Sequence, residues 1–583
     1  MTPDILRDSA VGMIINLASG GRLLPFADQR GDYVIPSRYT SSATVAQPST
    51  SPAEPSRMQT NGLANQQDGS TLVDEAGVVH TKYVEGEKLD VSALETNASP
   101  ETLSPEQVSI YPFLVDWDGS NDPANPRNWS TSKRMFVAFQ ICFMTTAVYI
   151  GSAIYTSSIE SIMQEFGVIQ VVATLGLSLF ILGYSIGPIF LGPLQDAVAI
   201  GRTPIYIGGL FLYVLFQMPV LLAPNIGTIL VFRFFAGFVG SPALSTGGTS
   251  MTELFPMHVW AYAIGFWAIG AVCGPVLGPV IGGFAAQANG WRWPIYELLW
   301  ISGFALIILA LFLPETSEKT ILYRRAVRLR RLTGNTAIKT QHELDAGHDN
   351  SIFKSVRNNF VVGLKISADP AIGFANVYIG LVYAIFYLWF ETFPIVFTQI
   401  HGFNLGVAGL PYLGFVVTAV ITFTFYVLYN KLHMDPGMMR GDMAPENRLE
   451  LGIMAGMFIP ISLFMCGWGA KAHWIVPVIG AALYFPGIFL LFQSILMFVS
   501  MYVKPEYNSS VMASNTFFRS SFAAAFPLFG AYYVKALGVG GSCSLLAGVS
   551  IVMVPVLWLL HKNGKQLRQK LKYPFRSTVI DNH

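Results

Sequence analysis

The segment from Gly265 to Phe284 reads GFWAIGAVCGPVLGPVIGGF and decides which fold we predict for this chain. It carries no charge, and as a helix it is long enough to cross a bilayer core of about 30 Å. Its glycines recur at every fourth position and therefore lie on one side of the helix: Gly270, Gly274, Gly278 and Gly282. A neighbouring helix can approach such a stripe to backbone contact. Pro275 and Pro279 each remove a backbone donor and should bend the helix. The pattern fits a static packing seam, and it also fits a span that moves against its neighbours.

The composition is that of a polytopic membrane protein. Of the 583 residues, 52% are hydrophobic and 12% are charged, whereas soluble domains carry about 25% charged residues. The net charge of +1 argues against nucleic acid as a partner, because phosphate binding needs concentrated Lys and Arg. The four cysteines lie apart in apolar stretches and show neither a disulfide framework nor metal-ligand spacing: Cys142, Cys273, Cys466 and Cys543. The cysteine spacing therefore predicts no metal site. The composition predicts that the protein lies in a lipid bilayer.

The apolar stretches follow a long polar beginning and form two sets of six. The first set lies near residues 136–156, 172–192, 204–222, 228–250, 260–284 and 295–313. The second set lies near residues 373–397, 408–430, 450–467, 473–500, 509–532 and 542–560. The two sets match in number and rhythm, as in transporters that arose by duplication. We predict an all-α membrane protein with twelve transmembrane helices in two six-helix halves.

These stretches divide the chain into five parts. We predict a cytoplasmic, largely disordered N-terminal region at 1–134, a first half at 135–313, a cytoplasmic middle loop at 314–370, a second half at 371–560 and a basic cytoplasmic tail at 561–583. From Ser37 to Ser109 the chain is rich in polar residues and Pro, and it cannot bury enough surface to fold. Basic residues gather in the middle loop and the tail. With an even number of spans, this places both termini in the cytoplasm. The arginine run of the middle loop also fits a solvated helix face.

The motifs of nucleotide-binding and hydrolytic enzymes are absent. The sequence contains no Walker A motif, no H-E-x-x-H and no G-x-S-x-G. The nine histidines do not cluster as metal ligands. We therefore expect neither enzyme activity nor a cofactor, and no use of ATP.

Ionisable residues stand out inside and beside the spans. Arg233 lies about one turn into the fourth span, where a charge is costly unless it faces protein or water; the alternative is a side chain that extends to the interface. Glu391 ends an aromatic run in the seventh span, and burial there disfavours its charged form. It is therefore a candidate proton carrier, against the alternative of a local hydrogen bond that holds the fold. Asp196 and Arg202 lie between the second and third spans and are candidates for an electrostatic latch, worth about 0–1 kcal/mol if exposed.

Aromatic residues crowd the start of the second half. The candidates for substrate contact are Tyr378, Tyr383, Tyr387, Phe390 and Phe393. Three of them fall on one helical face at positions i, i+4 and i+7, with hydroxyl groups on an apolar wall. Most aromatic residues in membrane spans only pack, which is the alternative here. A wall of this kind suits flat, apolar small molecules better than sugars.

Several motifs resemble those of the major facilitator superfamily, in its twelve-helix drug:proton antiporter branch. The run Gly270-Ala-Val-Cys-Gly-Pro-Val-Leu-Gly-Pro-Val-Ile-Gly-Gly283 resembles the antiporter motif of the fifth helix, which includes Gly283 as well as the four glycines of the stripe. Arg233 and Gly237 match the fourth-helix motif R-x-x-x-G, whose arginine the resemblance implicates in proton coupling. The segment from Gly192 to Arg202, which includes Asp196 and Gly201, resembles the gate loop between helices two and three. It departs from that motif because Ala197 stands where a basic residue is expected and two extra residues precede Gly201.

The resemblance extends over nearly the whole chain to fungal benomyl–methotrexate–azole resistance facilitators. It rests on Asn125-Pro-Arg-Asn-Trp129, Phe143-Met-Thr-Thr-Ala-Val-Tyr-Ile-Gly151, Pro314-Glu-Thr and Tyr387-Leu-Trp-Phe-Glu-Thr-Phe-Pro394. It implies a multi-pass plasma-membrane antiporter that uses the proton gradient to export xenobiotics, azole fungicides or secondary metabolites by alternating access. We expect such a protein to act as a monomer on a small-molecule substrate.

Two other functions stay open at this point. One is proton-coupled uptake of a small solute, which differs from export only in the direction of coupling. The other is a membrane sensor that transports nothing. A sensor would need a folded signalling domain, and the polar composition of the first 110 residues argues against one. The identity of the substrate does not follow from any of these motifs.

Overall fold

The computed structural model describes residues 3–19, 22–30, 33–36, 39, 113–345, 352–440, 444–504 and 507–570. The disorder that we predict between 37 and 109 falls almost entirely outside these residues, as does the end of the basic tail.

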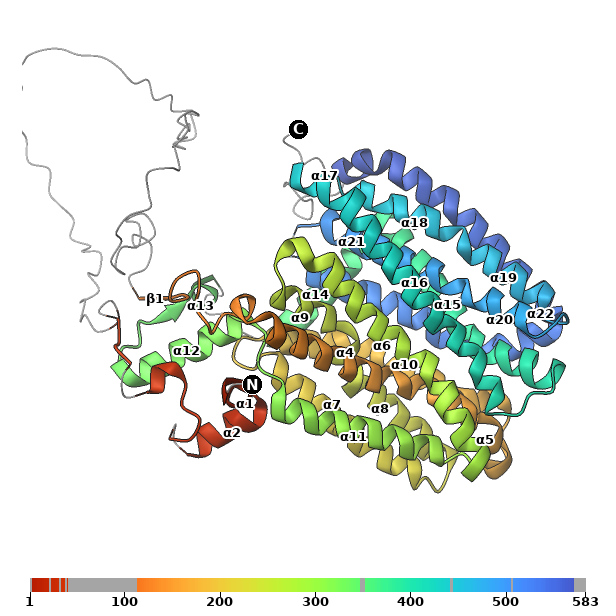
Figure 1. Cartoon of the computed structure of the whole chain (residues 1–583), viewed down its shortest axis with the longest axis horizontal. Helices are drawn as coiled ribbons and strands as arrows, with labels where there is room; N and C mark the ends of the chain where they lie inside the picture. The colour runs from red at the N-terminus through yellow and green to blue at the C-terminus, as the bar shows by residue number, and fades with distance from the viewer. Residues whose placement is uncertain are drawn as a thin grey trace, which may run out of the picture. The chain divides into compact units, whose positions relative to one another are not determined.

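Six apolar helical segments make up the first half of the bundle. In chain order they are α4 (Thr131–Ala153) with η4 (Ile154–Ser158) and α5 (Ile159–Phe166), α6 (Gln170–Asp196), α7 (Arg202–Leu221), α8 (Ile226–Ser245) with α9 (Gly247–Leu254), η5 (Met257–Val259) with α10 (Trp260–Asn289), and α11 (Trp293–Phe312). In Figure 1 these helices run from orange to yellow-green and lie side by side.

Five apolar segments make up the second half, coloured teal to blue in Figure 1. They are α15 (Pro370–Phe393) with the π-helical turn η6 (Pro394–Ile400); η7 (Val407–Tyr412) with α16 (Leu413–Tyr429), the π-helical turn η8 (Asn430–Met434) and α17 (Asp435–Arg440); η9 (Pro445–Arg448) with α18 (Leu449–Gly456) and α19 (Phe458–Gly469); α20 (Ile475–Ala482) with α21 (Tyr484–Tyr502); and α22 (Asn508–Lys570).

The last of these segments contains two spans. Helix α22 has 63 residues, which is about three times the length needed to cross a bilayer core. It breaks at Gly538, whose φ of 68° and ψ of 164° are not helical. The hydroxyl of Tyr533 donates to the carbonyl oxygen of Ser542 at 2.7 Å, a contact that a continuous helix would not allow between residues nine apart. The eleven apolar segments thus supply twelve spans, as the sequence predicts.

The outer faces of several spans are apolar and exposed. On α11 the exposed side chains include Trp300, Phe304 and Ile307, and on α16 they include Val417 and Ile421. The α11 residues recur at intervals of three and four and so form one stripe. A stripe of large exposed apolar side chains is expected where a helix faces lipid.

The segment between the halves is largely helical, and so is part of the N-terminal region. The described elements are α1 (Pro3–Asp8), α2 (Ala10–Ala18), η1 (Ala27–Gln29), β1 (Leu114–Val115), η3 (Pro126–Asn128), α12 (Glu318–Thr333), β2 (Lys339–Thr340), α13 (Gln341–Asp345) and α14 (Ile352–Ser367). The arginine run lies on α12 and is not simply a solvated face. Arg325 pairs with Asp122 at 2.8 Å, and Arg328 pairs with Asp28 at 2.7 Å. We call the end of the bundle from which α12 leaves the α12 end, and the opposite end the η7 end.

The glycine stripe of α10 packs against α4 within the first half. A Cβ added at Gly274 would lie 2.6 Å from Cβ of Tyr149 and 2.8 Å from the backbone nitrogen of Ile150. One added at Gly278 would lie 2.7 Å from the backbone nitrogen of Ile154. Both prolines lie inside α10, which continues through them. The stripe is therefore a seam of backbone contact that holds the first and fifth spans together.

We expect Gly274→Ala to destabilise the protein by about 1–3 kcal/mol, because even a methyl group overpacks the seam. The glycine spacing alone predicts that Ala is milder than Leu at this position, and the contact distances show that Ala already overpacks it. The control is Gly303→Ala on α11, where no atom lies within 4 Å of the added Cβ. Thermal unfolding in detergent, followed by size-exclusion fluorescence, measures both variants. Equal melting temperatures for the two would contradict the close contact.

Candidate functional site

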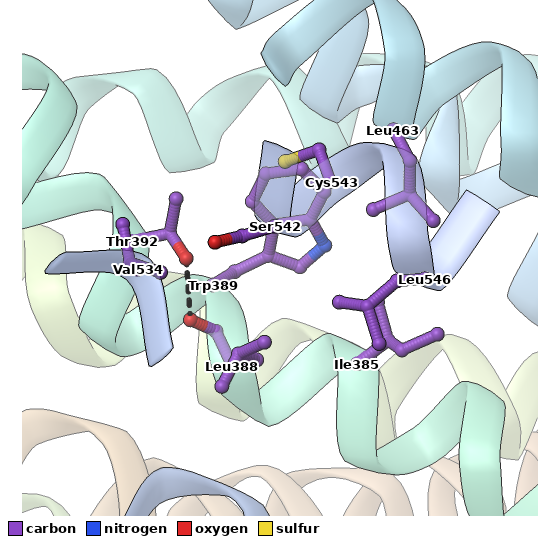
Figure 2. A pocket seen from close by; sticks show the side chains of 9 residues that line it. All are labelled: Ile385, Leu388, Trp389, Thr392, Leu463, Val534, Ser542, Cys543 and Leu546. Carbon is purple, nitrogen blue, oxygen red and sulfur yellow. Dashed lines mark hydrogen bonds between the residues drawn. The ribbon is translucent and has the colours of Figure 1, made fainter. Parts of the chain in front are cut away.

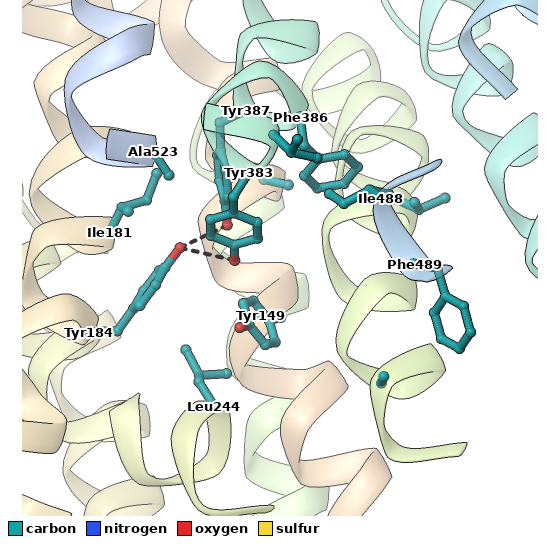
Figure 3. Close-up of a cluster of buried hydrophobic side chains, with 14 of the residues drawn as sticks. Tyr149, Ile181, Tyr184, Leu244, Tyr383, Phe386, Tyr387, Ile488, Phe489 and Ala523 are labelled. Carbon is teal, nitrogen blue, oxygen red and sulfur yellow. Dashed lines mark hydrogen bonds between the residues drawn. The ribbon is translucent and has the colours of Figure 1, made fainter. Parts of the chain in front are cut away.

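Tyrosine side chains from both halves meet in the middle of the bundle. The hydroxyl of Tyr184 on α6 donates to that of Tyr387 on α15 at 3.1 Å and lies 3.3 Å from that of Tyr383. Ser152 on α4 lies 3.3 Å from the Tyr387 hydroxyl. Figure 3 shows these rings turned toward one another, with Tyr149 of α4 beside them. The structure thus brings two of the predicted substrate-contact residues to the interface between the halves.

The other three predicted aromatic residues lie elsewhere along α15. Phe390 stacks on Tyr412 with ring centres 5.5 Å apart, and Phe393 lies 4.4 Å from the same ring, so both pack against the next span. Tyr378 packs near Phe374 inside the second half, and its hydroxyl has no hydrogen-bond partner among the described residues. Substrate contact by these residues stays a prediction.

Glu391 joins the halves nearer the η7 end. Its side chain is only 6% exposed. Its two carboxylate oxygens accept hydrogen bonds from Gln170 at 3.3 Å and Thr174 at 3.5 Å, both on α6. Within the part of the chain that the structure describes, it forms no ion pair. Glu391 is therefore a buried acid held only by neutral donors from the opposite half.

Arg233 is fully buried within the first half. The alternative that its side chain extends to the membrane–water interface is therefore wrong. Its Nε donates to the carbonyl oxygen of Gly176 at 3.0 Å, and its Nη1 donates to that of Gly151 at 2.8 Å. The guanidinium carbon lies 4.3 Å from the ring centre of Tyr155 and 4.8 Å from that of Phe180. Two carbonyls and two ring faces thus stabilise the charge.

The predicted pair between Asp196 and Arg202 is present, but Arg202 has a closer partner. Its Nη2 lies 2.9 Å from Glu253 on α9 and 3.7 Å from Asp196. Asp196 is half exposed, so solvent weakens that pair. All three residues belong to the first half. The role of Asp196 and Arg202 as an electrostatic latch of the cytoplasmic gate stays a prediction.

Gly201 allows the same cluster to close around Glu315. Its φ is +83°, and a Cβ there would lie 2.4 Å from a carboxylate oxygen of Glu315. That carboxylate accepts hydrogen bonds from the backbone nitrogens of Arg202 and Thr203 at 3.1 and 3.4 Å. Nearby, burial lowers the pKa of Arg324 from its ordinary value, and Glu315 opposes that shift. The gate-loop glycine thus serves as the point where the loop meets the segment after α11.

Direct contacts between the halves also occur at both ends of the bundle. At the α12 end, the hydroxyl of Tyr262 on α10 donates to Asp435 on α17 at 2.5 Å. At the η7 end, the backbone nitrogen of Gly406 donates to Gln287 at 2.8 Å. A Cβ added at Gly283 would lie 2.8 Å from the Leu405 carbonyl oxygen. Of the predicted motif glycines, Gly283 is thus the one that faces the second half. Together with the central tyrosines, these contacts describe a closed conformation.

Sequence reasoning missed both Tyr262–Asp435 and a buried arginine, Arg519. Nothing in the local sequence pairs a tyrosine with an aspartate 173 residues later. Arg519 could have been found, because it interrupts an apolar span just as Arg233 does. Its side chain is 7% exposed and lies against Tyr383.

The pocket in Figure 2 does not coincide with the predicted substrate site. It lies within the second half, between α15, α19 and α22. Its lining is mostly apolar: Ile385, Leu388, Trp389, Thr392, Leu463, Val534, Ser542, Cys543 and Leu546. The only polar contact drawn there is the local bond from the Thr392 hydroxyl to the Leu388 carbonyl oxygen. In the described ranges, no three His, Cys, Asp or Glu side chains are grouped as metal ligands.

Comparison with known proteins identifies the family. A family model described as Major Facilitator Superfamily matches residues 141–527. The chain belongs to the major facilitator superfamily. This confirms the predicted resemblance, and membership makes the chain a membrane transporter.

Fungal transporters are among the relatives of this facilitator. It is 40% identical over 513 residues to Transporter mfs1 of Schizosaccharomyces pombe, covering 85% of this chain and 96% of the relative. It is 36% identical to the cycloheximide resistance protein of Candida maltosa, covering 98% and 99%. It is 39% identical to fluconazole resistance protein 1 of Saccharomyces cerevisiae, covering 83% and 89%.

A solved structure supports the facilitator fold. The proton:xylose symporter XylE bound to 6-bromo-6-deoxy-D-glucose matches with a TM-score of 0.52 and 17% identity, covering 74% of this chain and 97% of that one. At this identity the likeness concerns the fold alone. It confirms the predicted all-α facilitator fold.

We expect Tyr262→Phe to favour opening at the α12 end. The bond to Asp435 is charge-assisted, and such bonds contribute about 1.5–3 kcal/mol, so its loss should shift the conformational equilibrium by about 10- to 150-fold. The reporter is Ser185→Cys, since Ser185 is buried on α6 toward that end. Its maleimide labelling should rise in Tyr262→Phe and stay constant in the control Tyr296→Phe, whose ring is exposed on α11. Unchanged labelling in Tyr262→Phe would show that this bond does not hold the halves together.

Proposed function

We propose that this facilitator is a proton-driven exporter of flat, apolar or amphipathic xenobiotics, azoles or secondary metabolites. The observation that carries the proposal is Glu391, a buried carboxyl group whose hydrogen-bond donors come from the opposite half. Binding or release of a proton at such a group changes the contact between the halves. The names of two relatives, which concern resistance to cycloheximide and to fluconazole, support export of apolar toxic compounds.

The coupling follows from hydrogen-bond chemistry. An ionised Glu391 accepts from Gln170 and Thr174 through charge-assisted bonds, which are roughly twice as strong as neutral ones. Protonation weakens both bonds and favours separation of the halves at the η7 end. Loss of the proton restores them. Proton binding and the opening of the pathway at that end are therefore linked.

Arg233 positions the helices of the first half that contact Tyr387 and Glu391. Its two carbonyl partners, Gly151 and Gly176, lie one residue from Ser152 and two residues from Thr174. The guanidinium thereby fixes the register of α4 against α6, on which the contacts to Tyr387 and Glu391 depend. Because a guanidinium does not discharge, Arg233 acts as a fixed charge and a positioning residue.

The proposal includes orientation, location and energy source. The α12 end carries the arginine-rich helix and is the cytoplasmic one, so both termini are cytoplasmic. The protein lies in the plasma membrane, acts as a monomer, and has no catalytic activity, cofactor or ATP requirement. The proton gradient supplies about 2.3 kcal/mol per charge for each 100 mV and about 1.4 kcal/mol for each pH unit.

Inverted plasma-membrane vesicles test the direction of transport. Their interior corresponds to the cell exterior, so an exporter should load labelled cycloheximide or fluconazole when the interior is acid. The control is the same membrane without the protein. Loading only when the interior is alkaline would instead favour proton-coupled uptake, and no loading of any compound in a broad panel would favour a sensor.

A second experiment tests Glu391 as the proton carrier. We expect Glu391→Gln to retain substrate binding but to lose the dependence of export on the proton gradient, because the amide keeps the hydrogen bonds and cannot release a proton. The matched control is Glu297→Gln on α11, which removes a carboxylate from a span away from these contacts. Export is measured at several external pH values with equal surface abundance. A wild-type pH profile in Glu391→Gln would remove Glu391 from the proton pathway.

A further inference from the structure

Arg519 is a buried cation in the first part of α22. Its guanidinium carbon lies 5.0 Å from the ring centre of Tyr383 and 4.7 Å from that of Phe492. Its Nε has no hydrogen-bond partner, and it takes part in none of the ion pairs formed by the residues that the structure describes. A charge inside a bilayer is costly, and two ring faces offset only part of that cost. Arg519 is therefore a donor without an acceptor.

The position of Arg519 links it to the contact between the halves. Tyr383 lies midway along α15 and its hydroxyl lies 3.3 Å from that of Tyr184 in the first half. Tyr149 on α4 lies close enough to interact electrostatically with Arg519 and to contact Tyr383. Figure 3 shows Tyr149 and Tyr184 facing Tyr383 across this interface. When the halves separate, the guanidinium and these hydroxyl groups face the space that opens.

We propose that Arg519 is the polar anchor of the substrate site and binds an anionic group, such as a carboxylate, on an otherwise flat aromatic molecule. The planar guanidinium matches a carboxylate with two parallel, charge-assisted hydrogen bonds, which a neutral alcohol with its single oxygen cannot form. The rings of Tyr383, Phe386 and Tyr387 provide the apolar wall against which the aromatic part lies. This inference rests on the proposed function, because it names the class of molecule that the exporter takes.

The anchor is separate from the proposed proton site. Glu391 follows Tyr383 by eight positions along α15, which is roughly 12 Å along a helix. An anion at Arg519 therefore does not pair with the group that binds the proton, nor does it displace Gln170 or Thr174. Substrate charge and proton are held at different depths of the same interface.

Binding of two matched probes tests the anchor. Pyrenebutyrate and pyrenebutanol share one aromatic body and differ in the carboxylate. The purified full-length protein in detergent is titrated with each probe, for the wild type, Arg519→Gln, Arg519→Lys and the control Lys535→Gln, which removes an exposed cation from the same helix. Thermal unfolding of each variant verifies that it is folded.

We expect the wild type and Lys535→Gln to bind the acid at least about tenfold more tightly than the alcohol. Arg519→Gln should bind both probes equally, and Arg519→Lys should keep part of the preference. Equal binding of both probes by the wild type would overturn the anchor, and this measurement does not depend on any variant being folded. An undiminished preference for the acid in Arg519→Gln would overturn it as well.

Vesicle transport separates this inference from the proposed function. If the wild type shows the Arg519-dependent preference but never loads pyrenebutyrate into acid vesicles, the anchor stands and export fails. If vesicles load the alcohol as fast as the acid and Arg519→Gln changes neither, export stands and the anchor is overturned.

Discussion

A polar group that a bilayer-spanning bundle shields from water is costly unless another part of the protein pairs with it. Arg233 finds its partners within the first half, in two backbone carbonyls and two ring faces, while its Nη2 has no hydrogen-bond partner among the described residues. Glu391 and Tyr387 find partners across the interface, Glu391 in Gln170 and Thr174 of α6 and Tyr387 in Tyr184 of α6 and Ser152 of α4. The stability of each half and the attraction between the halves thus come from the same constraint. What differs is whether the partner lies on the same side of the interface.

That difference also determines how much of the fold and the site could be predicted from the sequence. The spans follow from hydropathy alone, and even the two spans of α22 were separable because Gly538 lies in a short weakly apolar gap. The contact partners of individual residues could not be predicted in this way, because they depend on how helices far apart in the chain are arranged. The glycine spacing of α10 predicts a close neighbour but not that the neighbour is α4. Likewise, Arg202 was expected to pair with nearby Asp196, whereas its closer partner is Glu253.

The tyrosine cluster and the two buried ionisable residues, Glu391 and Arg519, have different proposed roles at the interface between the halves. In the substrate site that we propose, hydroxyl groups exchange hydrogen bonds with one another at little cost, so the rings of Tyr184 and Tyr383 rearrange around different molecules. Broad specificity is what such adaptable aromatic surfaces provide. As the proposed anchor, Arg519 beside Tyr383 would determine which end of a bound molecule lies deepest.

The backbone contact between α10 and α4 has a mechanical consequence. Along the glycine seam, the side chains and backbone of α4 lie directly against the backbone of α10. Because this close contact resists sliding, the two helices move together as one rigid unit. Helix α10 has 30 residues and is about 45 Å long. Rotation of this unit by about 10° around its middle moves each tip by about 4 Å, enough to break a bond such as that between Tyr262 and Asp435. A small rotation of α4 and α10 about their middle thereby breaks the contact between the halves at the α12 end and tightens the one at the η7 end. This motion does not require a change in the curvature of either helix.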